Sequence, residues 1–271
     1  MGRVIAVANQ KGGVGKTTTA VNLCASLAAA EKHVLAVDMD PQGNLSSGLG
    51  FTRPDVKQNI YNVLTEQCPI EAVQLDTDLE FLKLVPANTD LIGAEIELVG
   101  VEARQRRLLD ALKPVSNHFD FIVIDCPPSL GLLTLNALVA ANGVLVPLQC
   151  EYYALEGLSH LILTIERVRG AYNPRLELEG ILLCMYDKRM NLPRQVAKEV
   201  QQHFEGKVFE TVIPRNIRLS ESPSFGKPIL LYDIDCSGAQ AYLQLAQELL
   251  KRYPSEPKQD PSTVALVRRE Q

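Results

Sequence analysis

Short apolar runs alternate along the chain with longer segments in which apolar residues recur at helical spacing. The runs are nearly continuous in Val, Leu, Ile and Ala, as expected for strands buried on both faces, and they occupy residues 4–8, 34–38, 121–125, 143–148 and 178–185. Helix-like stretches separate several of them, at residues 19–30, 150–171 and 192–204. This alternation predicts an α/β fold, a doubly wound and mostly parallel sheet with helices on both faces.

Other segments carry the same patterns less clearly. We expect strands over 79–85 and 208–213, a short helix over 60–64, one or two helices over 92–112 and a closing helix over 237–253. The predicted helices over 92–112 include Arg104, Arg106 and Arg107, which are interpreted as a solvated helix face. Residues 1–253 are predicted to form one domain, and the polar, proline-containing residues 254–271 a flexible tail.

The first strand leads into a glycine-rich stretch that restarts as a helix. Unpaired backbone N–H groups and the helix dipole at such a junction attract phosphate, which predicts a cradle made by Gly12, Gly13, Val14, Gly15, Lys16, Thr17 and Thr18. Lys16 would meet the β- and γ-phosphates, the Thr17 hydroxyl would bind Mg²⁺, and Thr18 could reach the α-phosphate. A flexible solvated turn is the alternative, but the strand, loop and helix context favours the cradle.

The string KGGVGKTT departs from the usual GxxxxGK[ST] pattern. Gln10 occupies the first glycine position, and a second lysine stands at Lys11. The string resembles the deviant Walker A motif of the ParA/Soj and MinD family of ATPases. This resemblance implies that Lys11 reaches across a dimer interface to the nucleotide of the other subunit.

Two further motifs end in acids at predicted strand ends, the ligand-binding edge of such sheets. VDMDPQGN resembles the switch I loop of the family, which implies that Asp40 orients the attacking water and that Asp38 lies near Mg²⁺; alone, its Asp-Pro-x-Gly string would be an ordinary turn. FIVID has the Walker B pattern, so Asp125 should hold Mg²⁺ through a water or accept a hydrogen bond from Thr17. The following Cys126-Pro127-Pro128-Ser129 resembles switch II.

The loop Pro214-Arg215-Asn216 follows a predicted strand and is placed where an adenine could rest. The strings QCEYYALEG and IRLSESPSFGKP are similar to ParA/Soj proteins, so the resemblance runs from Arg3 to Tyr253. It implies ATP and Mg²⁺ as ligands, an ATP-dependent homodimer, non-specific binding of double-stranded DNA and a ParB-type centromere-binding partner that stimulates hydrolysis. Basic residues that match this role are Arg189 and Arg218, and less surely Lys198, Lys227 and Lys251.

Composition excludes only a few classes of protein and of binding site. A formal charge of −5 over 271 residues argues against a protein that coats nucleic acid all over, but leaves room for a basic patch. The six cysteines form no C-x-x-C pair and are expected to be reduced and mostly buried. The four dispersed histidines suggest no metal site. No signal-peptide or membrane-spanning pattern is present, so we expect a cytoplasmic, nucleoid-associated protein.

Three alternatives remain open from the sequence. A MinD-like membrane-surface ATPase would need a C-terminal amphipathic helix, and residues 262–271 contain a brief apolar run and two arginines. An electron-transfer ATPase of the nitrogenase-reductase type would hold an iron–sulfur cluster between subunits, and its purified protein would be coloured. A ParA-like positioner of another cargo shares all of the chemistry described above.

Overall fold

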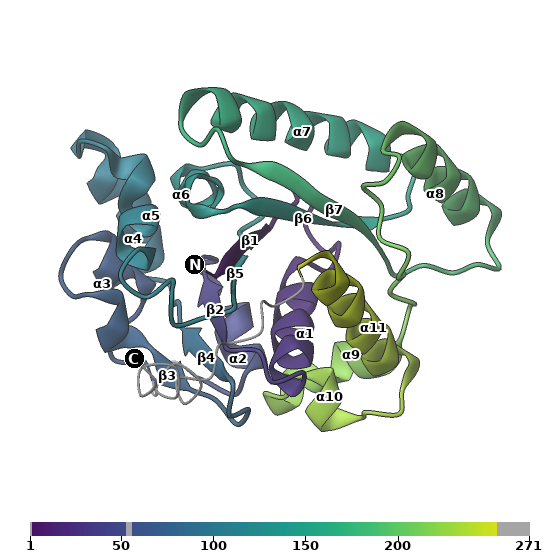
Figure 1. Ribbon diagram of the computed structural model, residues 1–271, viewed down its shortest axis with the longest axis horizontal. Coiled ribbons are helices and arrows are strands. Elements are labelled where there is room, and N and C mark those ends of the chain that lie inside the picture. Colours follow the sequence, from purple (N-terminus) through teal and green to yellow (C-terminus); the bar gives the residue numbers. More distant parts are fainter. Residues whose placement is uncertain (1, 53–55, 254–271) are drawn as a thin grey trace, which may run out of the picture.

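The computed structural model describes residues 2–52 and 56–253. Its strands are β1 Arg3–Val7, β2 Val34–Asp38, β3 Leu75–Asp76, β4 Leu82–Val85, β5 Phe121–Asp125, β6 Gly143–Gln149 and β7 Glu177–Cys184. They form one seven-stranded sheet in the order β3-β4-β2-β5-β1-β6-β7 (Figure 1). Neighbouring strands are parallel, except that β3 runs antiparallel to β4.

Helices cover both faces of the sheet. One face carries α3 Ile60–Leu64, α4 Leu91–Glu97, α5 Arg107–Leu112, α6 Leu132–Ala140, α7 Ala154–Ala171 and α8 Asn191–His203. The other face carries α1 Lys16–Ala29, α2 Asn44–Gly48, α9 Ile217–Glu221, α10 Ile229–Tyr232 and α11 Ser237–Arg252. Short 3₁₀ turns η2, η3, η4 and η5 lie at Ile70–Val73, Leu98–Gly100, Arg104–Arg106 and Ser222–Phe225.

Side chains along the strands alternate between two hydrophobic cores. In β1, Val4 and Ala6 belong to the core beneath α3–α8, whereas Ile5 and Val7 belong to the core beneath α1 and α11. Successive side chains of a strand point to opposite faces, so a strand covered on both sides is apolar at every position. The two cores thus explain the uninterrupted apolar runs, and the predicted doubly wound fold is confirmed.

Several element boundaries differ from the sequence prediction. The expected strand over 79–85 is shorter and begins at Leu82, and the two-residue strand β3 pairs with its edge. Helix α1 begins at Lys16 rather than Thr19, because the phosphate loop itself supplies the first turn. Helices α2, α6, α9 and α10 were not anticipated, and α2, α9 and α10 are too short for a periodic pattern to be visible.

The predicted strand over 208–213 is wrong. The segment runs beside β7 but pairs with it only through isolated bridges, from Ile181 to Val208 and from Tyr186 to Pro214. Between these bridges, the backbone N–H groups of Glu210 and Thr211 donate to the carboxylate of Glu248 on α11, at 2.9 and 3.0 Å. Because a side chain takes the donors that a strand would share with its neighbour, no continuous ladder forms.

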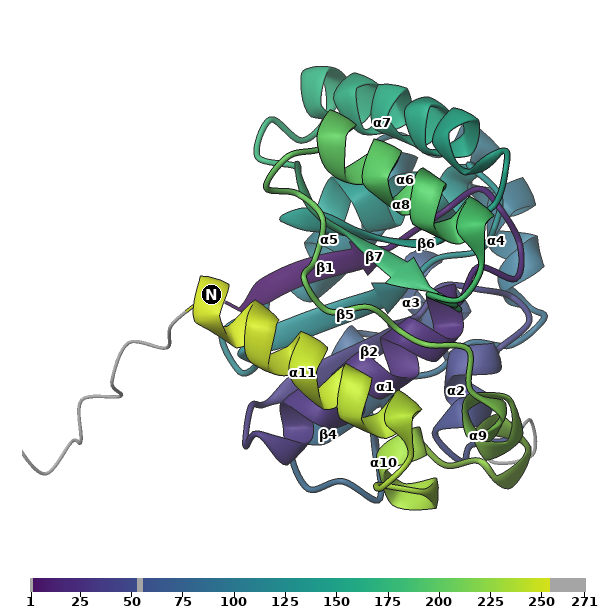
Figure 2. The same cartoon turned by 90° about the vertical axis from the view of Figure 1, so that its right-hand side faces the viewer.

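A buried carboxylate joins the beginning of β1 to the end of α11. Glu179 on β7 is 3% exposed and accepts hydrogen bonds from the Arg3 guanidinium and the Tyr253 hydroxyl, the latter at 2.9 Å. Arg3 also lies over the Tyr253 ring, 4.4 Å from its centroid. Figure 2 shows the last turns of α11 beside the start of β1. These contacts lie at the amino-terminal end of β1, whereas the phosphate loop follows the carboxyl end of β1. The two features are therefore at opposite ends of the parallel strands.

The arginine cluster is only partly a solvated face. Arg104 and Arg106 are exposed, but the Arg107 side chain is 18% exposed and forms an ion pair with Glu66.

No helix within residues 2–52 and 56–253 combines the length and hydropathy that a membrane span requires. Both the predicted tail and the residues on which the membrane alternative depends lie outside the described residues.

Candidate nucleotide site

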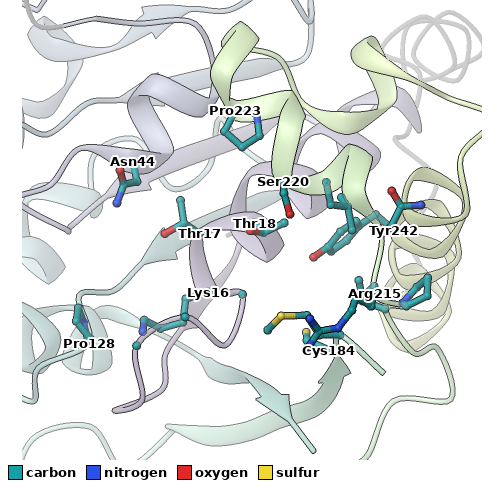
Figure 3. Close-up of a pocket in the computed structure, with 18 of the residues that line it drawn as sticks. Lys16, Thr17, Thr18, Asn44, Pro128, Cys184, Arg215, Ser220, Pro223 and Tyr242 are labelled. Atoms are coloured by element: carbon teal, nitrogen blue, oxygen red, sulfur yellow. The ribbon is translucent and has the colours of Figure 1, made fainter. Parts of the chain in front are cut away.

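A cavity of about 590 Å³ opens at the carboxyl edge of the sheet, beside the point where strand order reverses around β1. Segments distant in sequence line it: Gly12, Gly13, Gly15, Lys16, Thr17 and Thr18 of the phosphate loop; Asp40, Gln42 and Asn44 after β2; Pro128 after β5; Cys184 and Met185 at the end of β7; Ile213, Pro214, Arg215, Asn216, Leu219, Ser220 and Pro223; and Tyr242 of α11. In Figure 3, Lys16 and Pro128 lie at one end of this cavity and Arg215, Cys184 and Tyr242 at the other.

The phosphate loop is shaped by glycines and anchored by Asn9. Gly13 and Gly15 have φ values of +72° and +96°, a backbone region that residues with a Cβ rarely adopt. Asn9 is buried; its amide donates to the Pro147 carbonyl at 2.7 Å, and its side-chain oxygen accepts from the Lys11 N–H at 3.0 Å. No side chain caps α1, so the N–H groups of its first turn face the cavity, as the predicted cradle requires.

Lys16 is held inside the loop. Its side chain is largely buried, and the ammonium donates to the Lys11 carbonyl at 3.0 Å. Burial lowers the pKa of Lys16, whereas the nearby carboxylates of Asp125 and Asp40 act to raise it. Among the described residues the Lys16 ammonium makes one hydrogen bond, to a backbone carbonyl, so it has further N–H donors available for phosphate oxygens.

Val14 differs from the other residues of the predicted cradle. Its side chain is 1% exposed and packs into the interior, so only its backbone N–H can contribute to a phosphate site. Thr17 and Thr18, by contrast, line the cavity with their side chains.

The two aspartates after β2 have different surroundings. Asp38 is fully buried, and its oxygens accept hydrogen bonds from the Asp40 N–H at 3.1 Å and from the Ser46 N–H and hydroxyl at 2.9 and 2.7 Å. Burial raises the pKa of Asp38 to about 6 despite these donors. Asp40 lines the cavity and accepts from the Gln42 N–H at 2.9 Å. Asp38 therefore holds in place the loop that presents Asp40 to the cavity. This role is additional to the position near Mg²⁺ that the sequence analysis expected for Asp38.

Asp125 is the carboxylate best suited to a cation. It lies beside Asp38 in the sheet register and is fully buried, and neither of its oxygens has a hydrogen-bond partner of good geometry among the described residues. Burial, followed by the charge of Asp38, raises the pKa of Asp125, while Thr17 and Lys16 act to lower it. A buried carboxylate without a donor, next to a threonine hydroxyl, fits a hydrated Mg²⁺, which needs few protein ligands when phosphates supply others.

Lys11 lies at the mouth of the cavity rather than within it. Its ammonium forms an ion pair with Glu151, just before α7, and both side chains are close to half exposed. Tyr152 and Tyr153 stand beside this pair, 76% and 67% exposed, with their rings in an edge-to-face contact. The lysine is thus on the surface, where a second molecule could meet it.

At the end of the cavity away from Lys16, the loop that was predicted to bind the adenine base lines the cavity wall. Residues that the sequence analysis did not identify also line this end. Pro214, Arg215 and Asn216 all line the cavity, but the Asn216 side chain is also the N-cap of α9 and accepts from the Arg218 N–H at 2.8 Å. Met185 and Tyr242 were not anticipated. The position of Met185 directly after β7 was a usable signal, whereas nothing in the sequence places a residue of the closing helix at this pocket.

Comparison with known proteins identifies the family. A protein-family model described as an AAA domain matches residues 2–178. The chromosome partitioning protein ParA of Myxococcus xanthus is 57% identical over 95% of this chain and 92% of its own length. The sporulation initiation inhibitor protein Soj of Bacillus subtilis is 55% identical over 92% of this chain and 98% of its own. The chain belongs to the ParA/Soj family of chromosome-partitioning ATPases.

A solved structure supports the same placement. A Mycobacterium smegmatis protein named cobyrinic acid a,c-diamide synthase, crystallised with ADP and magnesium, is 40% identical to this ParA/Soj family member. It superposes with a TM-score of 0.82 and covers 94% of this chain and 96% of its own. The nucleotide-binding fold of the ATPase family is therefore shared along nearly the whole described chain.

The basic residues nominated for DNA do not form one cluster in this ParA/Soj chain. Arg189 and Arg215 share the neighbourhood of Asp187, because the loops after β7 and before α9 meet at the bridge between Tyr186 and Pro214. Arg218 follows three residues after Arg215, at the start of α9. All three lie at the carboxyl edge of the sheet, near the nucleotide cavity.

The three lysines are spread further apart. Lys198 is two turns into α8, about 10 Å along the helix from its start. Lys227 follows η5. Lys251 lies near the far end of α11, about 20 Å from Ser237, which accepts a hydrogen bond from Asn216 at the cavity. Lys251 is therefore not brought together with the arginines.

Both nominated arginines are paired with carboxylates. Arg189 donates to both oxygens of Asp187, at 2.9 and 2.7 Å, and these bonds lower the pKa of Asp187 to about 2. Arg218 lies 2.9 Å from Glu221 and 3.4 Å from Asp233. Any phosphate that these arginines bind must compete with the neighbouring acids.

The cysteines of the family member are free thiols, and Cys24, Cys126, Cys150 and Cys184 are buried. Burial raises the pKa of Cys126 and Cys184 beside the nucleotide cavity, so both remain protonated. Within the described part of the chain, no three His, Cys, Asp or Glu side chains converge on a metal position.

Proposed function

We propose that this protein is a partition ATPase whose ATP-bound dimer binds DNA without sequence preference and is released when a ParB-type partner stimulates hydrolysis. The observation that carries the proposal is one cavity lined by a glycine-shaped phosphate loop, Lys16 and Asp40. Close to Lys16 lies the buried carboxylate of Asp125, which has no hydrogen-bond partner of good geometry among the described residues. Sites of this kind catalyse phosphoryl transfer mainly by positioning and charge stabilisation.

Each residue has a defined task in this proposal. The N–H groups of the loop and Lys16 bind the β- and γ-phosphates, and Thr18 contacts the α-phosphate. Asp40 orients the attacking water, and the hydrogen bonds from Ser46 to Asp38 keep the loop of Asp40 in place. Thr17 and Asp125 hold Mg²⁺, with Asp38 behind them, and the ion supplies positive charge to the phosphate oxygens when bound.

The exposed position of Lys11 supports dimerisation. A lysine at the mouth of the cavity can reach a nucleotide held by a second copy that faces it. The neighbouring Tyr152 and Tyr153 are large, exposed and apolar over most of their surface, which suits a protein interface. Two copies placed mouth to mouth would bury both nucleotides between them.

DNA binding needs only exposed cations that face phosphates, and these contacts weaken steeply with salt. Arg189, Arg215 and Arg218 are gathered at the cavity edge, so they are the leading candidates, and Lys198 on α8 and Lys227 after η5 are further candidates. Binding that depends on ATP and is reversed by hydrolysis would place the protein on the nucleoid. The ParB-type partner enters the proposal from the sequence resemblance to the ParA/Soj family.

The test measures DNA binding by the Asp40→Ala protein, which should bind ATP without hydrolysing it. Affinity for two unrelated duplexes is determined with ATP, with ADP and without nucleotide, each across a salt series. Asp78→Ala, which removes an exposed carboxylate away from the cavity, is the matched control and should retain wild-type ATP turnover. We expect Asp40→Ala to lower turnover about 10²–10⁴-fold, the usual contribution of such a group.

Binding that appears only with ATP, is equal for both duplexes and weakens with salt supports the proposal. An Asp40→Ala protein that dimerises with ATP but binds no DNA in any nucleotide state contradicts the DNA part. Co-sedimentation of that ATP-bound protein with anionic lipid vesicles would then favour the membrane alternative. Wild-type turnover by Asp40→Ala would contradict its assignment.

A further inference from the structure

Two segments that have different roles in the proposed ATPase cycle approach each other closely through the backbones of two glycines. Gly50 follows α2 and Gly226 follows η5, with φ values of +92° and +62°. A Cβ added to Gly226 would lie 2.9 Å from the Gly50 Cα, and one added to Gly50 would lie 3.2 Å from the Gly226 carbonyl oxygen. Both the backbone conformation and the closeness of the contact therefore require glycine.

The Gly50 side of the contact is rigidly joined to the loop of Asp40. Helix α2 is only five residues long, and its Ser46 donates to Asp38 while accepting from the Ala87 N–H at 3.1 Å. Gly43, which begins the helix, lies so close to the Ala87 carbonyl that a Cβ there would be 2.9 Å from its oxygen. A shift of the loop around Asp40 must therefore move α2 and Gly50 with it.

The Gly226 side is joined to the base end of the cavity and to candidate DNA contacts. Leu219 and Pro223 line the cavity. Arg218 directly precedes Leu219 on α9, and Lys227 directly follows Gly226. The segment 216–227 thus carries both cavity-lining residues and surface cations.

Between the two segments and α1 the structure is hollow. A cavity of about 240 Å³ lies there, lined among others by Val21, Ser47, Ser222 and Lys227. Side chains do not fill this space, so α2 and the segment 216–227 are not locked to α1 along their whole length. Gly50 and Gly226 follow residues that line this cavity, Gly48 and Pro223, and give the two segments a direct backbone contact.

We propose that the contact between Gly50 and Gly226 couples the nucleotide state sensed around Asp40 to the position of Arg218 and Lys227. ATP and ADP differ only in the γ-phosphate. An element that responds to this difference must therefore contact the loop of Asp40, which faces the γ-phosphate in the proposed function. Helix α2 does so, and Gly226 is the point at which its position reaches the DNA-facing segment. The inference rests on the proposed function and assigns Gly50 and Gly226 as positioning residues.

The experiment compares Gly226→Ala and Gly50→Ala with Gly206→Ala. Gly206 also has a positive φ, +72°, but no atom lies within 4 Å of its would-be Cβ, so the control carries the backbone strain without the contact. For each protein, the affinity for a fluorescent ATP analogue, dimerisation by light scattering, and DNA affinity with a non-hydrolysable ATP analogue and with ADP are measured. The decisive quantity is the ratio of the two DNA affinities.

We expect Gly206→Ala to keep the wild-type ratio. Gly226→Ala and Gly50→Ala should bind nucleotide and dimerise like the control, but their ratio should fall about tenfold, within the range of typical coupling between sites. A variant that only loosened the fold would lower nucleotide affinity as well. An undiminished ratio in both variants would overturn the proposal.

A second measurement uses the wild-type protein alone. Hydrogen exchange of residues 216–227 is compared between the ATP analogue and ADP, with α7 as an internal reference. Slower exchange with the ATP analogue supports the coupling, and unchanged exchange overturns it even where the alanine variants fail to fold. Should the wild-type protein bind no DNA, the proposed function fails, while the exchange result still decides whether this contact transmits the nucleotide state.

Discussion

The ammonium of Lys11 pairs with the carboxylate of Glu151 within one subunit, at the mouth of the nucleotide cavity. In the proposed dimer the same ammonium reaches the nucleotide of the other subunit, so the two interactions exclude each other. The internal pair therefore opposes dimerisation by whatever free energy it contributes.

Glu151→Gln should strengthen the ATP-dependent dimer. Exposed ion pairs contribute about 0–1 kcal/mol each, and the symmetric dimer breaks one in each subunit, so the dimer dissociation constant should fall by up to about 30-fold. Sedimentation equilibrium in the Asp40→Ala background measures it, and Glu156→Gln, an exposed glutamate on α7, is the control. A weaker dimer would instead mean that Glu151 contacts the partner subunit.

Lys16→Ala should remove most nucleotide affinity while leaving the fold intact. Hydrogen bonds to charged groups contribute about 1.5–3 kcal/mol, which corresponds to a loss of roughly 10- to 150-fold in affinity for ATP. Titration with a fluorescent ATP analogue measures the loss, circular dichroism reports the fold, and Lys207→Ala is the exposed control. Unchanged affinity would show that the backbone of the loop alone holds the phosphates.

Some parts of this site could be predicted from sequence because local patterns determine them. Lys16 and Asp40 follow buried strands and Asp125 ends one, and the carboxyl ends of parallel strands meet at one edge of the sheet. Glycines at 13 and 15 likewise indicate positive φ in a loop before a helix. The positions of these residues after or at strand ends therefore predict that they lie at the same edge of the sheet.

Other parts depend on tertiary contacts that no local pattern reveals. Tyr242 reaches the cavity only because α11 packs against α1, where its hydroxyl lies 3.3 Å from that of Thr19. The segment 208–213 has the composition of a strand, yet Glu248 from α11 takes its backbone donors. The distance of Lys251 from the arginines likewise follows from the direction of α11, not from its sequence.

Asp187→Asn should raise the affinity of the ATP-bound protein for DNA. The substitution removes the carboxylate that occupies Arg189, so the guanidinium becomes available to a phosphate without first breaking two hydrogen bonds. One added phosphate contact steepens the dependence of log affinity on log salt by about one unit. A salt series of DNA titrations measures this slope.

The matched control for that experiment is Asp76→Asn. Asp76 also pairs with an exposed lysine, Lys83, but on the edge strand β3, far from the arginines along the sheet. Its substitution makes the same change in net charge. An equal gain in both variants would attribute the effect to net charge rather than to the release of Arg189.

Glu179→Ala should destabilise the domain strongly. Removing one partner of a buried ion pair typically costs about 3–5 kcal/mol, because Arg3 and Tyr253 lose their shared acceptor. Glu177→Ala removes a half-exposed partner of the same arginine and should cost about 0–1 kcal/mol. Urea denaturation of the two variants gives the difference, and equal midpoints would contradict the importance of burial.

The nucleotide cavity joins the phosphate loop, which begins at Gly12, to Tyr242 in the first half of α11, the last helix of the described chain. During synthesis a chain therefore cannot complete its ATP site until almost the whole domain has left the ribosome, because one wall of the site is made last. A nascent or truncated chain that ends before α11 would retain the phosphate-loop sequence but lack that wall. Newly made protein should thus gain full nucleotide affinity, and with it the ability to form the ATP-dependent dimer, only once α11 has packed against α1.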